Sequence, residues 1–179
     1  AKVDEILKGA KDEMDSVSRL THWVGDEVRY SGISMGCGEG YTLHKGSMTF
    51  NDRCGVCKDK AGMAITMLRA AGFTVYPAMT MAGSRIDYIP ADQFNHCVTV
   101  WRKPDRTTVL LDPTWIPGVR EMWSSREQQQ EVLMGLPEGV DILDGTFFED
   151  PLTPYPYVPV NETKMDEVPA EPQAADLEQ

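Results

Sequence analysis

Three residues of the kinds that form a thiol-based catalytic site occur in the order Cys57, His96 and Asp112. A thiol attacks a carbonyl carbon as its thiolate, so it needs a base that takes its proton. A histidine can act as that base, and a carboxylate can fix the tautomer of the histidine and stabilise its protonated form. The sequence therefore predicts nucleophilic chemistry at an acyl carbon, provided that the fold brings these three side chains together.

The segment from Arg53 to Phe73 is predicted to place the cysteine at the start of a helix, with Gly55 before it and Gly72 as its stop. One face of this helix carries apolar residues at the helical period, namely Cys57, Ala61, Ala64, Ile65, Leu68 and Ala71. Unpaired N–H groups of a first turn favour a thiolate and would face a developing oxyanion, and we expect Lys58 and Lys60 to add positive charge. A small cysteine buried beneath the helix is the alternative.

The histidine and the aspartate lie on a predicted β-hairpin. Residues 94–102 and 107–112 are apolar and rich in strand-forming residues, and 103–106 has a turn sequence. His96 and Asp112 lie an even number of residues apart, so they share a face only if the connection has an odd residue count or a bulge. A three-residue loop, Pro104 to Arg106, meets this condition.

Other segments follow from periodicity and composition. The irregular stretch 31–51 carries Tyr41 and His44, which together with Trp115 are candidates for substrate binding or for the oxyanion site. The remaining predicted elements are helices at 3–13 and 16–29 with Ser16 as a possible cap, a strand at 74–81, a loop at 86–94, a helix at 124–134 behind Ser124 or Ser125, and a strand at 140–148.

The chain is acidic, and its charge is uneven. The net charge of −11 argues against nucleic acid and anionic membrane surfaces as partners, and no apolar run is long enough to cross a bilayer. From Phe147 onward, eight acidic residues face one lysine, so −7 of the net charge lies there among six prolines. We expect a globular domain over 1–150 and an acidic, proline-rich tail or linker over 151–179. Because the chain begins at Ala1, we expect a piece of a longer parent with other domains.

Four sequence words together resemble the core of the transglutaminase-like superfamily, over roughly residues 20–115. They are Gly-Val-Cys57-Lys-Asp59-Lys-Ala61, Met67-Leu-Arg-Ala-Ala-Gly72-Phe, Phe94-Asn-His96 and Leu111-Asp112-Pro113-Thr114. The resemblance is closest to a bacterial branch of multidomain, often exported proteins. It implies a papain-like α+β fold, with the cysteine helix packed on an antiparallel sheet and flanked by N-terminal helices. It also implies Cys57 as nucleophile, His96 as base and then acid, and Asp112 as the orienting carboxylate.

Two further cysteines depart from the family pattern. Cys54 creates a Cys-x-x-Cys word with Cys57, and Cys97 follows the histidine directly, so either could capture the nucleophile by oxidation. The alternatives are a dithiol redox site or a zinc site at Cys54 and Cys57, a disulfide such as Cys37 to Cys54, and a catalytically silent binding or scaffold module.

The sequence and the resemblance together predict a thiol-dependent hydrolase or acyltransferase that acts on a peptide or side-chain amide through an acyl-enzyme. We expect hydrolysis rather than cross-linking, because water is always available as the acceptor. The partner is then a peptide or protein substrate, and neither a cofactor nor a metal is expected. The resemblance favours a periplasmic or cell-surface location.

Overall fold

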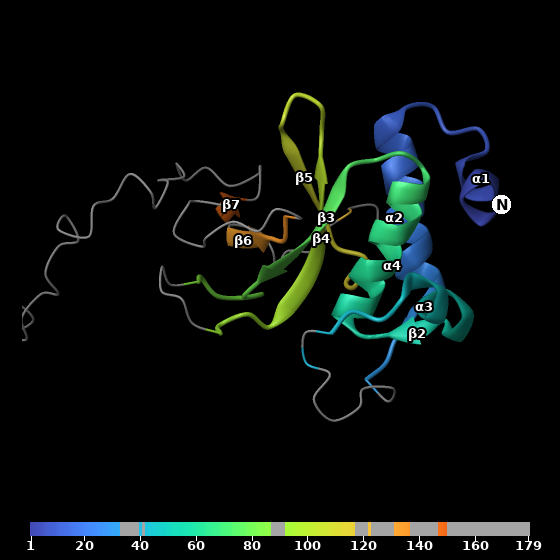
Figure 1. Ribbon diagram of the computed structural model, residues 1–179. Coiled ribbons are helices and arrows are strands. Elements are labelled where there is room, and N and C mark those ends of the chain that lie inside the picture. The colour runs from blue at the N-terminus through green and yellow to red at the C-terminus, as the bar shows by residue number, and fades with distance from the viewer. Residues whose placement is uncertain are drawn as a thin grey trace, which may run out of the picture.

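The computed structural model describes residues 1–32, 40, 42–86, 92–116, 122, 131–136 and 147–149. A layer of helices packs on one face of an antiparallel sheet (Figure 1). The helices are α1 (Lys2–Leu7), α2 (Glu13–Glu27), α3 (Gly46–Asp52) and α4 (Cys57–Ala70). The sheet has the order β5 (Thr108–Leu111), β4 (His96–Arg102), β3 (Val75–Thr80), β6 (Glu131–Met134) and β7 (Phe147–Glu149), and a small parallel pair joins β1 (Arg29–Tyr30) to β2 (Cys54–Gly55). The predicted α+β fold is confirmed.

Helix α4 is the element that presents the cysteine, and it has the predicted bounds and buried face. It begins at Cys57, and Ala61, Ala64 and Leu68 are fully buried. At its other end Gly72 adopts φ +91°, which a residue with a Cβ rarely adopts. The N–H of Phe73 donates to the Leu68 carbonyl at 3.0 Å, which completes a Schellman motif. The helix is thus terminated by its own sequence.

The sheet is packed on both sides, and helix α4 lies on one of them. On one side, α4 lies between α2 and the sheet, in a core that includes Leu20, Leu68 and Trp101. On the other side, a second cluster contains Val98, Val100, Leu110, Val132 and Met134. Strand β4, which carries the histidine, is therefore packed on both faces.

The hairpin of β4 and β5 has the predicted three-residue connection. The ladder pairs Thr99 with Leu111 and Arg102 with Thr108. The N–H of Lys103 then donates to the Thr107 carbonyl at 2.8 Å, so only residues 104–106 form the loop. Arg106 closes the loop in the left-handed region, at φ +71°. This register, continued by one residue, sets position 112 opposite position 98 and on the same face as position 96.

The N-terminal helices differ from the prediction in their bounds. Helix α1 ends at Leu7, before Gly9 at φ +76°, instead of running to residue 13. Helix α2 is capped by Asp12, whose carboxylate accepts the Asp15 N–H at 2.7 Å, and not by Ser16. An aspartate three residues ahead of a free N–H is as good a cap as a serine, and Ser16 instead donates its hydroxyl to the Asp12 carbonyl.

The described C-terminal elements differ more from the prediction than the N-terminal helices do. The helix predicted over 124–134 is wrong for 131–134, where β6 pairs with β3 and Leu133 lies opposite Met79. Glu, Leu and Met are good helix formers, but sheet pairing and burial of Val132 and Met134 override that preference. Helix α3 was not expected within 31–51, whereas β3 and part of the predicted 140–148 strand are confirmed.

Several predictions fall outside the described residues. These are the segment 123–130, most of the 86–94 loop, Cys37, Tyr41, and the boundary between the domain and its tail at 150. The two-part division of the chain therefore stays a prediction. Within the part of the chain that the structure describes, no helix is both long and apolar enough to cross a membrane.

Candidate active site

Cys57 is the first residue of α4, and a buried carboxylate holds the turn around it. Asp59, whose side chain is 2% exposed, accepts the N–H of Val56 at 3.0 Å through Oδ2. Its other oxygen, Oδ1, lies 2.9 Å from Nδ1 of His44. A Cβ on Gly55 would lie 2.5 Å from the Cβ of Asp59, so only glycine fits there without a shift of the turn. These contacts fix the backbone that carries the half-buried thiol.

His96 and Asp112 form a buried pair. Nε2 of His96 lies 2.9 Å from Oδ2 of Asp112, and their side chains are 4% and 0% exposed. The carboxylate is itself held, because its Oδ1 accepts the N–H of Thr114 at 2.8 Å and its backbone N–H donates to the Met122 carbonyl at 2.6 Å. Since Nε2 is engaged, Nδ1 is the ring nitrogen left for another partner.

The histidine and the cysteine shift each other's titration in the direction of an ion pair. Burial lowers the pKa of His96. Hydrogen bonds with Asp112 and Cys57, together with the negative charges of both, raise it by more than burial lowers it, so that the pKa is about 10. Burial likewise raises the pKa of Cys57. The hydrogen bond with His96, the N–H groups of Cys97 and Lys58 and the charge of His96 outweigh burial, so the net pKa is lower than usual. The arrangement favours a thiolate beside an imidazolium.

The expected contribution of Lys60 takes another form. Its side chain is almost fully buried, and its Nζ donates to the carbonyl oxygens of Gly25, at 2.9 Å, and Val28. Burial lowers the pKa of Lys60 to about 8, although Asp112 and Asp26 oppose that shift. The ammonium group thus joins the end of α2 to the cysteine helix.

The other predicted site residues differ in how they are placed relative to Cys57 and His96. The ring of Trp115 lies 5.9 Å from that of His96 and is 42% exposed. His44 contacts Asp59 beneath the first turn of α4, so it supports the turn rather than lining the cleft. Tyr41 lies outside the described residues.

Tyr30 borders the site and was missed from the sequence. It stacks on Trp115, with ring centroids 5.9 Å apart, and burial together with the charges of Cys57 and Asp112 raises its pKa. The parallel pairing of β1 with β2 sets Tyr30 opposite Gly55, two residues before the thiol. No local pattern signals this position, because it depends on pairing between segments 25 residues apart.

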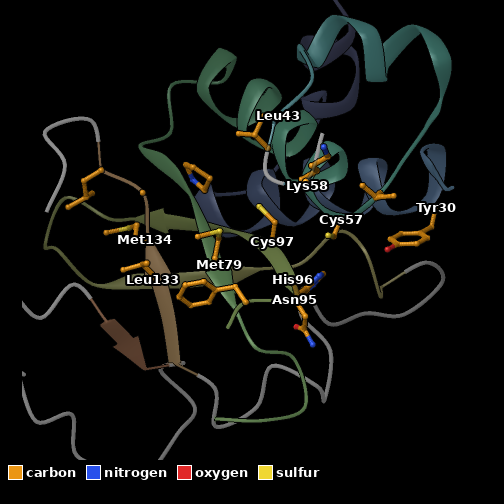
Figure 2. A pocket seen from close by; sticks show the side chains of 16 residues that line it. Tyr30, Leu43, Cys57, Lys58, Met79, Asn95, His96, Cys97, Leu133 and Met134 are labelled. Atoms are coloured by element: carbon orange, nitrogen blue, oxygen red, sulfur yellow. The ribbon is translucent and has the colours of Figure 1, made fainter. Parts of the chain in front are cut away.

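A cleft of about 730 Å³ opens at the thiol. Cys57 and His96 lie toward one end of it, and Leu133 and Met134 of β6 lie toward the other (Figure 2). Its lining is mostly apolar and consists of Tyr30, Gly40, Leu43, Val56, Cys57, Lys58, Pro77, Met79, Phe94, Asn95, His96, Cys97, Leu133, Met134, Gly135 and Leu136. A cleft of this size is typical of ligand sites.

Three of the four cysteines can be placed, and all three are free thiols: Cys54, Cys57 and Cys97. Burial, with the negative charges of Cys57, Asp112 and Asp59, raises the pKa of Cys97 to about 12, so Cys97 is a protonated and weak nucleophile. Cys54 is the first residue of the two-residue strand β2 and comes shortly after helix α3, whereas a thioredoxin-type Cys-x-x-Cys follows a longer strand. Among the described residues, no group of three or more His, Cys, Asp or Glu side chains is arranged to hold a metal ion.

The chain is similar to solved structures of bacterial proteins. A protein from Cytophaga hutchinsonii, described as a "putative cysteine protease", matches at 20% identity and a TM-score of 0.50, over 64% of this chain and 36% of that one. A "putative protease" from Parabacteroides distasonis matches at 16% identity and a TM-score of 0.59, over 86% of this chain and 27% of that one. The periplasmic domain of TgpA from Pseudomonas aeruginosa matches at 22% identity and a TM-score of 0.44, over 64% of this chain and 42% of that one.

This chain thus spans less than half the length of each of these structures. No curated protein matches the sequence. The model of the transglutaminase-like superfamily matches residues 1–117, which include all of Cys57, His96 and Asp112. The chain belongs to the transglutaminase-like superfamily.

Proposed function

We propose that this protein is a cysteine hydrolase of peptide or side-chain amides, with Cys57 as the nucleophile, His96 as the acid and base, and Asp112 as the positioning residue. The observation that carries this proposal is the buried pair of His96 and Asp112 at 2.9 Å, beside a thiol in the first turn of a helix. The fold shared with the Cytophaga hutchinsonii structure described as a "putative cysteine protease" is in keeping with it.

The proposed reaction begins with the thiolate of Cys57 and the imidazolium of His96. The sulfur forms a bond to the substrate carbonyl carbon, and the π electrons move to the oxygen, which would face the first N–H groups of α4. When the carbonyl re-forms, the C–N bond breaks and the amine takes the proton of His96. What remains is a thioester on Cys57 and a neutral imidazole.

Hydrolysis of the thioester uses the same histidine in the opposite sense. His96 accepts a proton from water as the water oxygen attacks the acyl carbon, and collapse of this second intermediate breaks the C–S bond. The thiolate leaves, and the imidazolium and the carboxylic acid product complete the cycle. Asp112 holds the ring through Nε2, so that Nδ1 serves the thiol in both halves.

The test compares two cysteine variants in an amidase assay with a mixed library of fluorogenic peptides. Cys57→Ala should abolish hydrolysis, and Cys54→Ser should retain it, because Cys57 is hydrogen-bonded to His96 and Cys54 lies in β2, before the helix. Equal loss in both variants would instead favour the dithiol or zinc alternatives at Cys54 and Cys57. Stoichiometric zinc in the purified protein would contradict the proposal as well.

Separate experiments decide three further questions: whether an acceptor other than water takes the acyl group, whether the domain is catalytically silent, and where the protein is located. Addition of a primary amine to the assay distinguishes transfer from hydrolysis, since transfer yields the amide in place of the acid. If Cys57 is unreactive and the Cys57→Ala variant behaves normally in cells, the domain serves for binding. We further propose an exported, periplasmic or cell-surface location, which fractionation of cells that express the full-length parent tests.

A further inference from the structure

We propose that the cleft selects substrates by a large apolar side chain, such as leucine, methionine or phenylalanine, on the acyl side of the bond that is broken. This inference rests on the proposed function of Cys57 and adds to it a class of substrate. It depends on three features of the cleft: the row of residues across its floor, the character of its lining, and the placement of the solvent-exposed aromatic pair.

A row of three residues crosses the sheet from the site. Cys97, Met79 and Leu133 are register partners on β4, β3 and β6, and all three line the cleft (Figure 2). Neighbouring strands lie about 4.8 Å apart, so the row extends about 10 Å from the residue next to His96. An extended peptide covers that distance in about three residues. The floor therefore fits the first few residues of a peptide held at the thiol.

The lining of the cleft favours an apolar occupant. Among the described residues that line it, none is Asp or Glu, and Lys58 is the single Lys or Arg. Leu43 is 44% exposed, Met79 and Leu133 are partly exposed, and all three can still lose water to a ligand. An apolar side chain placed there would be removed from water with them, whereas a carboxylate would lose hydration without a matching partner beyond Lys58.

The position of the aromatic pair indicates which side of the scissile bond the cleft holds. The departing amine must take its proton from His96, and water must then reach the acyl carbon from the side that the amine has left. Trp115, which lies 5.9 Å from the His96 ring, and its stacking partner Tyr30 are 42% and 50% exposed, so this side is open to solvent. The apolar part of the cleft, toward Leu133, is left for the acyl portion.

The experiment uses peptidyl chloromethyl ketones, acetyl-X-Ala-Ala-chloromethyl ketone with X as Leu, Phe, Gly or Asp, so that X is the third residue from the thiol, where the row reaches Leu133. These reagents place X on the acyl side and alkylate a thiolate without turnover. The rate at Cys57 is followed by mass spectrometry of the whole chain and divided by the rate with iodoacetamide, which reports the reactivity of the thiol itself. We expect the Leu and Phe reagents to exceed Gly and Asp by about 10- to 100-fold in this ratio.

Two variants locate the preference in the cleft. Leu133→Asp should lower the Leu-to-Asp preference at least about tenfold, and Leu133→Ala should lower it less, which guards against poor folding of the charged variant. Met14→Asp is the matched control, because Met14 is 40% exposed on α2 and does not line the cleft; its preference should equal that of the wild type.

The inference and the proposed function fail in different ways. If iodoacetamide modifies Cys57 fast in a manner that depends on His96, but the four ketones react at equal ratios, the inferred selectivity is wrong and the proposed function stands. If the preference persists unchanged in both Leu133 variants, it does not come from this cleft and the inference is also wrong. If Cys57 reacts with no reagent faster than an ordinary thiol, both are overturned.

Discussion

Replacement of Lys60 by methionine tests how the cysteine helix is held against α2. The side chain of Lys60 is 1% exposed, and its ammonium group donates to the carbonyl oxygens of Gly25 and Val28, at the end of α2. Gly25 lies in the last turn of α2 and Val28 is its C-cap, and the carbonyls at a helix end have no intrahelical N–H partner. Methionine has a stem of similar length, so Lys60→Met removes the donor while the packing volume is largely kept.

The expected loss of stability follows from the two acceptors. A buried acceptor that loses its partner costs about 1–3 kcal/mol, and two of them cost about 2–6 kcal/mol. Removal of a buried ammonium group, whose pKa burial lowers to about 8, offsets part of that cost. We therefore expect Lys60→Met to lower the free energy of unfolding at pH 7 by about 2–4 kcal/mol.

Urea denaturation followed by tryptophan fluorescence measures this difference. Lys8→Met is the control, because Lys8 is exposed, and it should change stability by less than about 0.5 kcal/mol. The folded pKa of Lys60, about 8, lies below the ordinary lysine value of 10.5, so between these values the folded state binds fewer protons than the unfolded state. Stability gains from this group as pH rises across that range, and the deficit of Lys60→Met should widen accordingly. A variant as stable as the wild type would show that the Lys60 ammonium group does not stabilise the junction of α2 and α4.

Three further variants probe the site. Asp112→Asn removes the charge that raises the pKa of His96, and should slow alkylation of Cys57 by iodoacetamide at pH 7 by at least about tenfold; an unchanged rate would contradict the assigned role. Gly55→Ala sets a Cβ 2.5 Å from that of Asp59 and should cost about 1–3 kcal/mol in urea denaturation, so an unshifted midpoint would exclude the clash. Because the folded pKa of His96, about 10, exceeds the ordinary histidine value of 6.5, the stability that His96 contributes as a cation is complete below pH 6.5 and is lost as the pH rises to 10. The difference in unfolding free energy between wild type and His96→Gln should shrink over that range, and a constant difference would count against the raised pKa.

The parts of the site that the sequence predicts are those encoded locally. The start and end of α4 follow from Gly55, Gly72 and the apolar stripe between them, and the hairpin register follows from the residue count between His96 and Asp112. Both depend on contacts within about 20 residues, so spacing alone is enough to place the cysteine in a first turn and the other two side chains on one face.

The parts that the sequence does not predict depend on distant partners. Leu133 lies on a strand because β6 pairs with β3, more than 50 residues earlier in the chain. Its neighbours in the sequence are helix formers, so the local pattern predicts a helix instead. Tyr30 reaches the thiol through the pairing of β1 with β2. Lysine side chains are usually exposed to solvent, and Lys60 is buried because its ammonium group binds carbonyl oxygens at the end of α2. Burial of polar side chains is set by tertiary packing, which a local pattern does not record.

The central claim is that Cys57 rests as a thiolate paired with the His96 imidazolium. It is tested most directly by the rate of alkylation of each cysteine against pH, resolved by mass spectrometry, in the wild type and in His96→Ala. We expect Cys57 to react fastest, with an apparent pKa below the ordinary thiol value of about 8.5, and His96→Ala to slow this reaction and raise that pKa. Reaction of Cys54 ahead of Cys57, or a Cys57 profile that His96→Ala leaves unchanged, would contradict the claim.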